Sequence, residues 1–594
     1  MTHKEKPRQS TFAAILDPRL GDIEDDASST KRRSMFSLAG SLLVEISLPK
    51  LVLAWILLLV LPGLLLGLVP IVVTSWLGAV ASKIASAFIG IWSALIFLAV
   101  AALGWFGWRT VVRTVEKNFW ALNSIVVQPG YAAAREILRH LTERAFAKHA
   151  SEATRAKLRA AAAAVAGILV SVFAGFVLWL VWPSAHLFAQ TSEIANWRDI
   201  VPVALANSVV VITAYLAVAA LVWGIADAAT PQPRGLTAFD EPQEGDRTWR
   251  AVHLSDIHIV GERYGFRIES GRSGPRGNDR LKRLFDKLEA IDANDRLDVI
   301  LITGDMTDAG ICTEWAQFFE LLAEHPSLAE RVLILPGNHD LNIIDRANPA
   351  RMDLPTSPDR RLRQIRALSA MDAVQGERVN VVDLSAGKLG ETLTAFLKPH
   401  ADAMKRFADE ARPLLSDALS VLWSKSFPVV LPPRREDGLG VILLNSNADT
   451  HFSFTNALGM VSAEQVRGIE IACAAYPGAC WIVALHHHVI EYPWAAKALS
   501  ERIGTALING NWFIRKMRPL ADRILLMHGH RHVDWIGECA ELRIVSAPSP
   551  VMEATNDMPT AFYIHTLAID GEGCLKLRRP ERIVLEGEVS GADA

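Results

Sequence analysis

The second half of the chain places short apolar runs between polar, loop-forming stretches. Five of these runs are rich in Val, Ile and Leu, and they cover residues 252–255, 299–303, 332–336, 481–485 and 524–527. Runs this short and this apolar predict β-strands that are buried on both faces. We therefore expect an α/β sheet domain in this half of the chain.

The first 230 residues show a different pattern, with long stretches that contain no Asp, Glu, Lys or Arg. Four such stretches cover residues 51–82, 84–108, 160–189 and 201–226. Each exceeds the roughly 20 residues that a helix needs to cross a bilayer. Because four uncharged runs of this length rarely occur together in a soluble chain, we predict four transmembrane helices, arranged as two hairpins in a lipid bilayer.

Basic residues concentrate on one side of these expected spans. The N-terminal tail (1–50) and the loop 109–159 are rich in Lys and Arg, whereas the two other loops contribute Lys83 and Arg198. The positive-inside rule then places both termini and the loop 109–159 in the cytoplasm. We expect a multi-pass protein of the inner (cytoplasmic) membrane, with its sheet domain in the cytoplasm.

The expected four-helix bundle suggests either an anchor or a transport path. Transporters and channels usually carry ionisable residues inside their spans, and these spans contain none apart from His186, near one end of the third. An anchor is therefore the favoured interpretation. The Ala-rich segment 131–164 carries Glu136 and Arg139 at a helical spacing, and we expect it to be a solvated helical connector.

Pro and Gly residues mark the boundary between the two halves. They predict a linker at 227–247, followed by a soluble domain over 248–590. Inside that domain, we predict a mainly helical insertion at about 345–435. We expect it to form a cap or a dimer surface, and in the second case the protein would be a homodimer. The remaining expected elements are a helix at 280–291 and strands at 441–444, 541–545, 561–567 and 573–578, of which the last three would complete the second sheet.

Composition narrows the classes of partner. The formal net charge is -3, so no bulk electrostatic attraction draws the chain toward nucleic acid. The five Cys residues show no CxxC pairing, which favours buried thiols in a reducing compartment over a thiolate metal site.

Metal-binding residue types follow each of the five apolar runs. In open α/β sheets, ligands bind beyond the carboxyl ends of the strands, so we expect these residues to converge at one rim. Asp, Asn and His together are the ligand types of a two-metal hydrolytic site. The clusters are Asp256 with His258, Asp305, Asn338 to Asp340, His486 to His488, and His528 with His530 and His532.

The ordered series Asp-x-His, Gly-Asp, Gly-Asn-His-Asp, His-His and Gly-His-x-His resembles the calcineurin-like metallophosphoesterases, over roughly residues 250–550. The resemblance implies a four-layer domain of two mixed β-sheets flanked by helices, following the membrane bundle. It also implies that a hydroxide bridging two divalent ions, Mn²⁺, Fe²⁺/³⁺ or Zn²⁺, attacks a phosphoester substrate. The Asn-His-Asp and His-His spacing looks most like the phosphodiesterases of cyclic nucleotides or small phosphodiesters.

The same resemblance assigns a role to each matched residue. It implies that His339 protonates the leaving oxygen or stabilises the transition state, and that Asp340 orients the His339 ring and favours its charged form. His488 stands where many relatives carry Pro. The implied metal ligands are Asp256, His258 and His532 for the first ion, Asn338, His486 and His530 for the second, and Asp305 as the bridge.

Other functions remain open at this stage. A phosphomonoesterase or a lipid-linked pyrophosphate hydrolase would use the same metals, although relatives that cleave nucleotide-linked lipid A precursors usually have Arg in place of His339. A membrane transporter or sensor with a phosphate-binding domain would typically have lost metal ligands. The basic, Gly-rich stretch 261–278 either steers anionic substrate or is a solvated loop.

Overall fold

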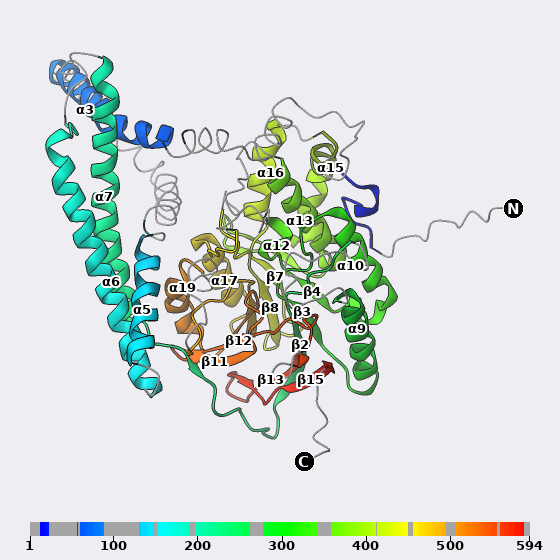
Figure 1. The fold of residues 1–594 in the computed structure, drawn as a ribbon. Helices are drawn as coiled ribbons and strands as arrows, with labels where there is room; N and C mark the ends of the chain where they lie inside the picture. Colours follow the sequence, from blue (N-terminus) through cyan, green and yellow to red (C-terminus); the bar gives the residue numbers. More distant parts are fainter. Residues whose placement is uncertain are drawn as a thin grey trace. The chain divides into compact units, whose positions relative to one another are not determined.

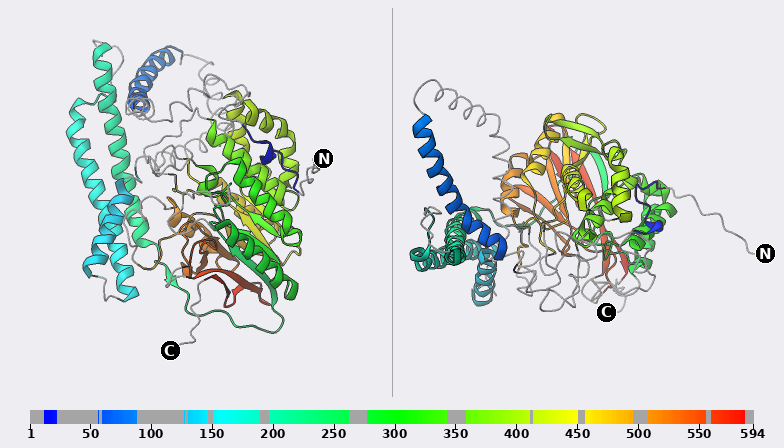
Figure 2. Two further views of the ribbon diagram at one scale, coloured as in Figure 1. Left: turned by 45° about the vertical axis from the view of Figure 1, so that its right-hand side comes forward. Right: turned by 90° about the horizontal axis from the view of Figure 1, so that it is seen from above.

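A computed structural model of the chain is shown in Figures 1 and 2. The structure describes residues 12–22, 56, 60–87, 127, 130–146, 151–188, 197–261, 277–342, 358–410, 413–449, 456–494, 507–554 and 559–586. The chain divides into two compact units. We call Met1–Ile46, Gln232–Trp494 and Ser500–Ala594 the sheet unit, and Ser47–Pro231 with Ala495–Leu499 the helical unit.

The sheet unit contains two mixed β-sheets. The larger has nine strands in the order β1-β11-β12-β10-β9-β8-β7-β5-β6, and the smaller has the order β14-β13-β2-β3-β4, with β15 also paired to β13. The strands are β1 (Arg234–Gly235), β2 (Arg247–Leu254), β3 (Val299–Ile302), β4 (Val332–Ile334), β5 (Asn380–Asp383), β6 (Lys388–Thr392), β7 (Val429–Leu431), β8 (Leu439–Leu443), β9 (Cys480–Ala484), β10 (Ile524–His528), β11 (Trp535–Cys539), β12 (Leu542–Ser546), β13 (Thr560–Ile569), β14 (Leu575–Leu577) and β15 (Glu581–Glu586).

The five predicted apolar runs are confirmed as the parallel strands β2, β3, β4, β9 and β10. Both faces of these strands are buried, as expected. In β9, Ile482 and Ala484 enter the core shared with the smaller sheet, whereas Trp481 and Val483 enter a second core. This alternation follows from the two-residue period of a strand, and it explains why the runs contain almost no polar residues.

Helices cover the outer faces of the two sheets, which gives the four layers predicted (Figure 2). On the larger sheet, α17 (Ala463–Ala475) and α19 (Gly510–Met517) supply apolar side chains to the second core. On the smaller sheet lie α9 (Gly277–Asn294), which contains the predicted helix 280–291, and α10 (Cys312–Glu324). Among the described residues no disulfide is present, and four of the five Cys are buried.

The predicted insertion is more than helical. Its helices are α13 (Asp359–Gln375), α14 (Leu393–Leu397), α15 (Ala401–Glu410) and α16 (Pro413–Lys425), but β5, β6 and β7 also lie within it and extend the nine-stranded sheet. The Val-Val pairs of β5 and β7 are too short to produce a clear strand pattern, and β6 contains a single large apolar residue, Leu389. The helices bury Leu368, Phe407 and Leu422 in the main core, so the insertion is part of the domain and not a separate cap.

Two further expectations about this unit need correction. The strand predicted at 541–545 is β12, which pairs with β10 in the larger sheet and not with the last two predicted strands, β13 and β14, in the smaller one. Within the expected linker 227–247, Arg234–Gly235 forms β1 and pairs with β11. Sequence alone could not choose between the two sheets, because short strands of either sheet have the same period.

The helical unit contains α3 (Leu61–Ala87), α5 (Ala133–Phe146), α6 (Glu152–Val181) and α7 (Trp197–Ala229). Among the described residues, three stretches are long and apolar enough to cross a membrane, at Leu61–Gly78, Ala153–Ser184 and Ile200–Ala229. The loop expected at Lys83 is wrong, because α3 continues through that residue. Most of the predicted span 84–108 lies outside the described residues.

The expected solvated connector is also wrong where the structure describes it. Along α5, Glu136, Arg139 and Glu143 are buried, and their partners include Arg135 and Arg159. The charges that suggested a solvated face therefore form an internal ion-pair network of the helical unit. A pattern of charges at helical spacing cannot distinguish these two environments.

Candidate metal centre

The predicted ligands converge beyond the carboxyl ends of the parallel strands. The loop after β2 and the loop after β3 run side by side, and backbone hydrogen bonds join them beyond the strands. His258 N donates to Asp305 O at 2.9 Å, and Asp256 N donates to Gly304 O at 3.1 Å. This extended ladder fixes the spacing of the Asp-x-His and Gly-Asp motifs relative to each other.

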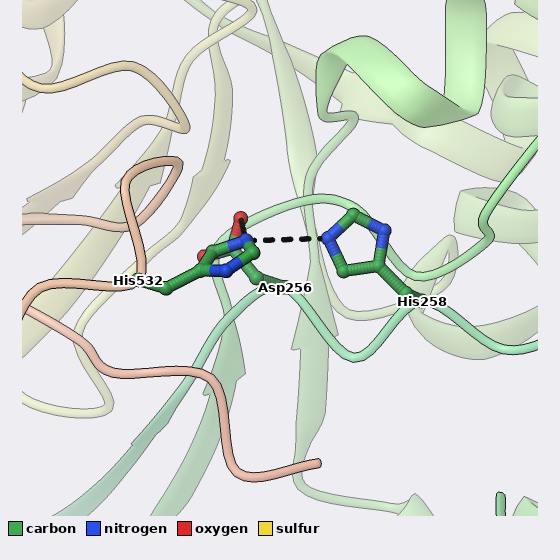
Figure 3. A group of neighbouring side chains, drawn as sticks. All are labelled: Asp256, His258 and His532. Carbon is green, nitrogen blue, oxygen red and sulfur yellow. Dashed lines mark hydrogen bonds and ion pairs between the residues drawn. The ribbon is translucent and has the colours of Figure 1, made fainter. Parts of the chain in front are cut away.

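Asp256, His258 and His532 form one cluster of ligand atoms (Figure 3). The Nε2 atoms of His258 and His532 lie 3.3 Å apart, and His532 Nε2 is 3.3 Å from Asp256 Oδ1. Facing imidazole nitrogens of this kind suit a shared cation, which would accept a lone pair from each ring. The structure thus brings together the three residues expected to hold the first ion.

A second cluster joins Asp305, His486 and His530. His486 Nε2 lies 3.1 Å from His530 Nδ1 and 3.0 Å from Asn338 Oδ1, so all the residues expected around the second ion are adjacent. Asp305 Oδ2 is 3.3 Å from His486 Nε2 and 3.9 Å from His258 Nε2. One carboxylate oxygen therefore lies between the two clusters, where a bridging ligand is required.

Five of the seven expected ligands have a backbone conformation that residues with side chains rarely adopt. Their φ angles are 55° for Asp256, 42° for His258, 53° for Asp305, 78° for His530 and 52° for His532. Left-handed backbone at a non-glycine residue costs free energy and persists when the surrounding structure enforces it. Its concentration at these residues indicates that the fold maintains strain in order to aim their side chains.

Glycines within the motifs allow the ligands to approach one another. A Cβ atom on Gly337 would lie 2.1 Å from Asp305 Oδ1 and 2.2 Å from Asp305 N. At Gly304, which has a φ of 96°, a Cβ atom would lie 2.4 Å from His486 Nδ1. Both motifs need glycine because a side chain would occupy the place of a metal ligand.

The electrostatics of the rim favour a bound cation. Burial alone would raise the pKa of Asp305, but His486 and His339 outweigh this effect and hold that pKa well below its ordinary value. Burial would lower the pKa of His486, yet Asp305 and Asp256 raise it to about 9. The carboxylates thus stay ionised and attract positive charge, which a metal ion would supply in place of the proton.

His339 forms a further group of neighbouring possible ligand atoms with His258 and Asp305. Its ring packs against that of His258 with centroids 4.4 Å apart, and Nδ1 is 2.9 Å from the backbone oxygen of Asp308. When Nδ1–H donates to this carbonyl, Nε2 is the ring nitrogen that remains for the site. The carbonyl of Asp308 therefore sets the tautomer and the orientation of His339.

Asp340 does not perform the role expected for it. Its carboxylate accepts hydrogen bonds from Thr307 N, Thr307 Oγ1 and Gly337 N, at 2.9, 2.6 and 2.8 Å. Asp340 thus ties the Gly-Asn-His-Asp loop to the Gly-Asp loop and does not orient the ring of His339. The sequence suggested the adjacent carboxylate, but the ring takes its partner from the backbone.

The other histidines of the motifs are arranged around the ligands. His487 Nδ1 is 2.9 Å from Ser446 Oγ, and His488 Nε2 is 3.4 Å from Glu491 Oε1. His253 Nε2 is 3.1 Å from the side-chain oxygen Oγ1 of Thr303. The backbone oxygen of the same threonine lies 2.8 Å from Nδ1 of His486. These histidines contact residues around the expected ligands and are not themselves among the expected ligands. Most of the basic stretch 261–278 lies outside the described residues.

Sequence reasoning missed one residue of the site, Asp308. Its side chain reaches His258, with Oδ1 3.4 Å from Nδ1, while its backbone oxygen contacts His339. A signal was present, because Asp308 follows Asp305 by three residues in the same loop. The choice of His486 from three consecutive histidines agrees with the geometry, since His487 and His488 contact other partners.

Comparison with known proteins supports this interpretation of the rim. The family model described as calcineurin-like phosphoesterase matches residues 250–502. Two curated relatives named probable cyclic nucleotide phosphodiesterase come from Vesicomyosocius okutanii and Coxiella burnetii. The first is 30% identical over 15% of this chain and 32% of its own length. The second is 28% identical over 18% of this chain and 38% of its own length. The chain thus spans about a third of each relative.

The solved structures add one comparison of shape. A dimetal phosphatase from Danio rerio aligns with 57% of this chain and 99% of its own, at 12% identity and a TM-score of 0.32.

Proposed function

This chain belongs to the calcineurin-like phosphoesterase family through residues 250–502, and from that premise we propose that it is a membrane-anchored, dinuclear-metal phosphodiesterase. One observation carries the proposal. All seven expected ligands are present and adjacent in two clusters, and Asp305 reaches both. A domain that only binds phosphate would not need the complete set.

The residues of the rim have separate roles in the proposed hydrolysis. Asp256, His258 and His532 would hold one divalent ion, Asn338, His486 and His530 a second, and Asp305 both. Two such ions would activate water and stabilise charge on the phosphoryl oxygens. Thr303 O fixes the tautomer of His486 by accepting from its Nδ1 at 2.8 Å, so that Nε2 is directed at the site.

His339 is the candidate general acid. Its Nδ1 is engaged by Asp308 O at 2.9 Å, and in the charged form Nε2 would carry a proton to the leaving oxygen. The fixed ring orientation removes the need to reorganise the donor during the reaction. We therefore expect the contribution of His339 to grow as the leaving group becomes more basic.

Two features support a diester substrate and a membrane location. Both curated relatives carry the name of a phosphodiesterase. The three apolar stretches of the helical unit support the membrane location, because they leave large hydrophobic side chains such as Phe173, Phe176 and Trp179 exposed, as lipid contact requires. We propose that these helices anchor the domain at the cytoplasmic face of the inner membrane.

The test uses the full-length protein in lipid nanodiscs. Hydrolysis of bis(p-nitrophenyl) phosphate and of p-nitrophenyl phosphate is measured after metal removal and after addition of Mn²⁺. We expect metal-dependent diester turnover that Asn338→Ala abolishes and His339→Ala lowers by about 10²–10⁴-fold. His400→Ala, which changes an exposed histidine outside the rim, is the matched control and should leave turnover unchanged.

Each other outcome has a defined meaning. Turnover of the monoester alone would replace the diesterase by a phosphomonoesterase at the same site. Binding of Mn²⁺ and phosphate without turnover of either ester would refute the enzymatic proposal and favour a ligand-binding domain.

A further inference from the structure

An N-terminal segment of the chain is built into the sheet unit. Residues 12–22 precede the helical unit in sequence, yet they pack on α10 and α13. Phe12 stacks on Phe319 with centroids 5.7 Å apart, and Leu16 N donates to Ser369 Oγ at 2.7 Å. This segment lies more than 200 residues before the family match at 250–502, so no motif pointed to it.

Asp22 ends the segment in a buried ion pair. Its carboxylate accepts from Nε and Nη2 of Arg366 on α13, and Cys312 Sγ donates to it at 3.2 Å. The side chains of Asp22 and Arg366 are 5% and 3% exposed. A bidentate pair removed from water in this way is held in one geometry.

Arg366 connects this pair to the metal-site loop. Its Nη1 donates to Gly310 O at 2.9 Å. Gly310 belongs to the loop that begins with the bridging ligand Asp305 and includes Asp308, whose backbone oxygen holds Nδ1 of His339. A continuous path of hydrogen bonds and one short loop thus leads from Asp22 to the candidate general acid.

The loop tolerates little movement at the point that Arg366 holds. Gly310 has a φ of 71°, and a Cβ atom there would lie 2.6 Å from Asp340 O. The apolar side chains Phe12, Ile15 and Leu16 of the segment pack against the main core. The segment also lines a cavity of about 320 Å³ together with residues of α10, α13 and α15.

We propose that residues 12–22 are a positioning element of the metal site, in which Asp22 acts through Arg366 on the loop that carries Asp305 and orients His339. This inference rests on the proposed function, since it assigns the segment a role in that reaction. Asp22 and Arg366 are positioning residues, because neither touches the expected metals or substrate.

The placement has a consequence for topology. Residues 12–22 and the sheet unit lie on the same side of any membrane, so the chain between them crosses an even number of times. The three described candidate spans are an odd number, and the four spans predicted from the sequence satisfy the requirement.

The test again uses the full-length protein in nanodiscs with saturating Mn²⁺. Two methyl aryl phosphates are compared, one with p-nitrophenol as leaving group and one with phenol, which leaves less readily. The variants are Asp22→Asn, Arg366→Gln and their combination, with Asp22→Glu as the conservative rescue. Asp17→Asn is the matched control, because Asp17 lies in the same segment but pairs with exposed Arg19.

A displaced general acid should lower kcat by about 10-fold to 100-fold, and the loss should be larger for the phenol ester. KM should change little, the double variant should be no worse than Arg366→Gln, and Asp22→Glu should recover most of the rate. Asp17→Asn should match wild type. If Asp22→Asn does not fold, Arg366→Lys carries the same test, since it keeps the charge but loses the bidentate geometry.

Two results would overturn the inference. One is wild-type kcat in folded Asp22→Asn protein, and the other is an equal loss for both leaving groups, which a smaller folded fraction would produce. Either result leaves the proposed function intact as long as the wild type turns over both esters. Failure of the wild type itself, or a His339→Ala loss that ignores the leaving group, would instead count against the proposed reaction.

Discussion

The two units both bury charged side chains, but they balance the charge in different ways. In the helical unit, three carboxylates are matched by three guanidinium groups. Asp227 and Glu136 pair with Arg135 at 2.6 and 2.8 Å, Glu136 also with Arg139, and Glu143 with Arg159 at 2.6 Å. These pairs lie on helices and match each carboxylate with a guanidinium group.

At the rim of the candidate metal centre, carboxylates and imidazoles pair only in part: Asp305 lies 3.3 Å from His486, but some ring nitrogens of the described residues have no hydrogen-bond partner. Imidazole nitrogens face imidazole nitrogens, and Nε2 of His530 is buried without a hydrogen-bond partner in the described part of the chain. Strained backbone at five ligands maintains this arrangement. The comparison teaches that buried charge alone does not mark a functional site. The informative signs are the convergence of possible ligand atoms from separate loops and the backbone strain that holds them there.

The largest expected effect comes from adding one methyl group at the rim. In Gly337→Ala the new Cβ would meet the backbone and carboxylate of Asp305, at 2.2 and 2.1 Å, and displace that carboxylate, the proposed bridge between the two ions. We expect a loss of kcat of about 10²-fold or more together with reduced bound metal. Gly571→Ala, with open space around the new Cβ, is the control. Full metal content and activity in Gly337→Ala would show that the close approach is dispensable.

Breaking a pair in the helical unit should change stability and not chemistry. Glu143→Gln leaves the guanidinium of Arg159, whose side chain is 5% exposed, buried without the Glu143 carboxylate. Removal of one partner of a buried pair costs about 3–5 kcal/mol, measured as the free energy of unfolding in micelles. The double variant Glu143→Gln/Arg159→Gln should be less destabilised than Glu143→Gln. A double variant as unstable as the sum of the two single ones would argue against a direct pair.

The contrast also explains which features the sequence could predict. Strands buried on both faces leave a plain apolar signature, so β2, β3, β4, β9 and β10 were located correctly, and the ligands that follow them were adjacent as expected. The position of these ligands depends on two things: each motif follows its strand in the sequence, and the strands pair in parallel, so that their carboxyl ends lie at the same edge.

Features that depend on contacts between distant residues could not be predicted. The buried charges of α5 pair with Arg159 on α6 and Asp227 on α7, and the contact of Asp22 with Arg366 joins residues 344 apart in sequence. The partner of His339 is a backbone oxygen, which any residue at position 308 would supply. Composition and spacing carry no information about such contacts, because they arise when separate elements pack together.

A smaller effect is expected where two helices of the helical unit approach closely. At Gly167 on α6 a Cβ atom would lie 2.7 Å from Ala220 O and 2.9 Å from the Cα of Gly224, both on α7. Small residues at such crossings let the backbones pack without intervening side chains. Gly167→Ala should therefore cost about 1–3 kcal/mol of stability, measured by unfolding in micelles.

Gly175→Ala on the same helix is the matched control. No atom lies within 4 Å of its added Cβ, and replacing a mid-helix Gly by Ala is favourable by about 1 kcal/mol. If both variants had the same stability, the close crossing of α6 and α7 would not contribute to folding.

The smallest effect concerns a buried histidine outside the rim for which the described residues provide no ion pair. His565 on β13 packs near His253 and Tyr563, and burial lowers its pKa to about 4. In the unfolded chain the pKa of this histidine is near 6.5, so between pH 6.5 and pH 4 it binds a proton there that it does not bind in the folded chain. Stability is therefore complete above pH 6.5 and falls as the pH drops toward 4, by about 1 kcal/mol at pH 6 and about 2 kcal/mol at pH 5.

In His565→Phe this proton is absent from both states, so the fall in unfolding free energy between pH 6.5 and pH 5 should be smaller by about 1.5 kcal/mol. The quantity to compare is the difference between variant and wild type at each pH, because the metal ligands titrate equally in both. An unchanged slope would mean that His565 is protonated in the folded state. In that case the interior of the sheet unit around β13 would accept a charge without an ion pair, unlike the paired charges of the helical unit.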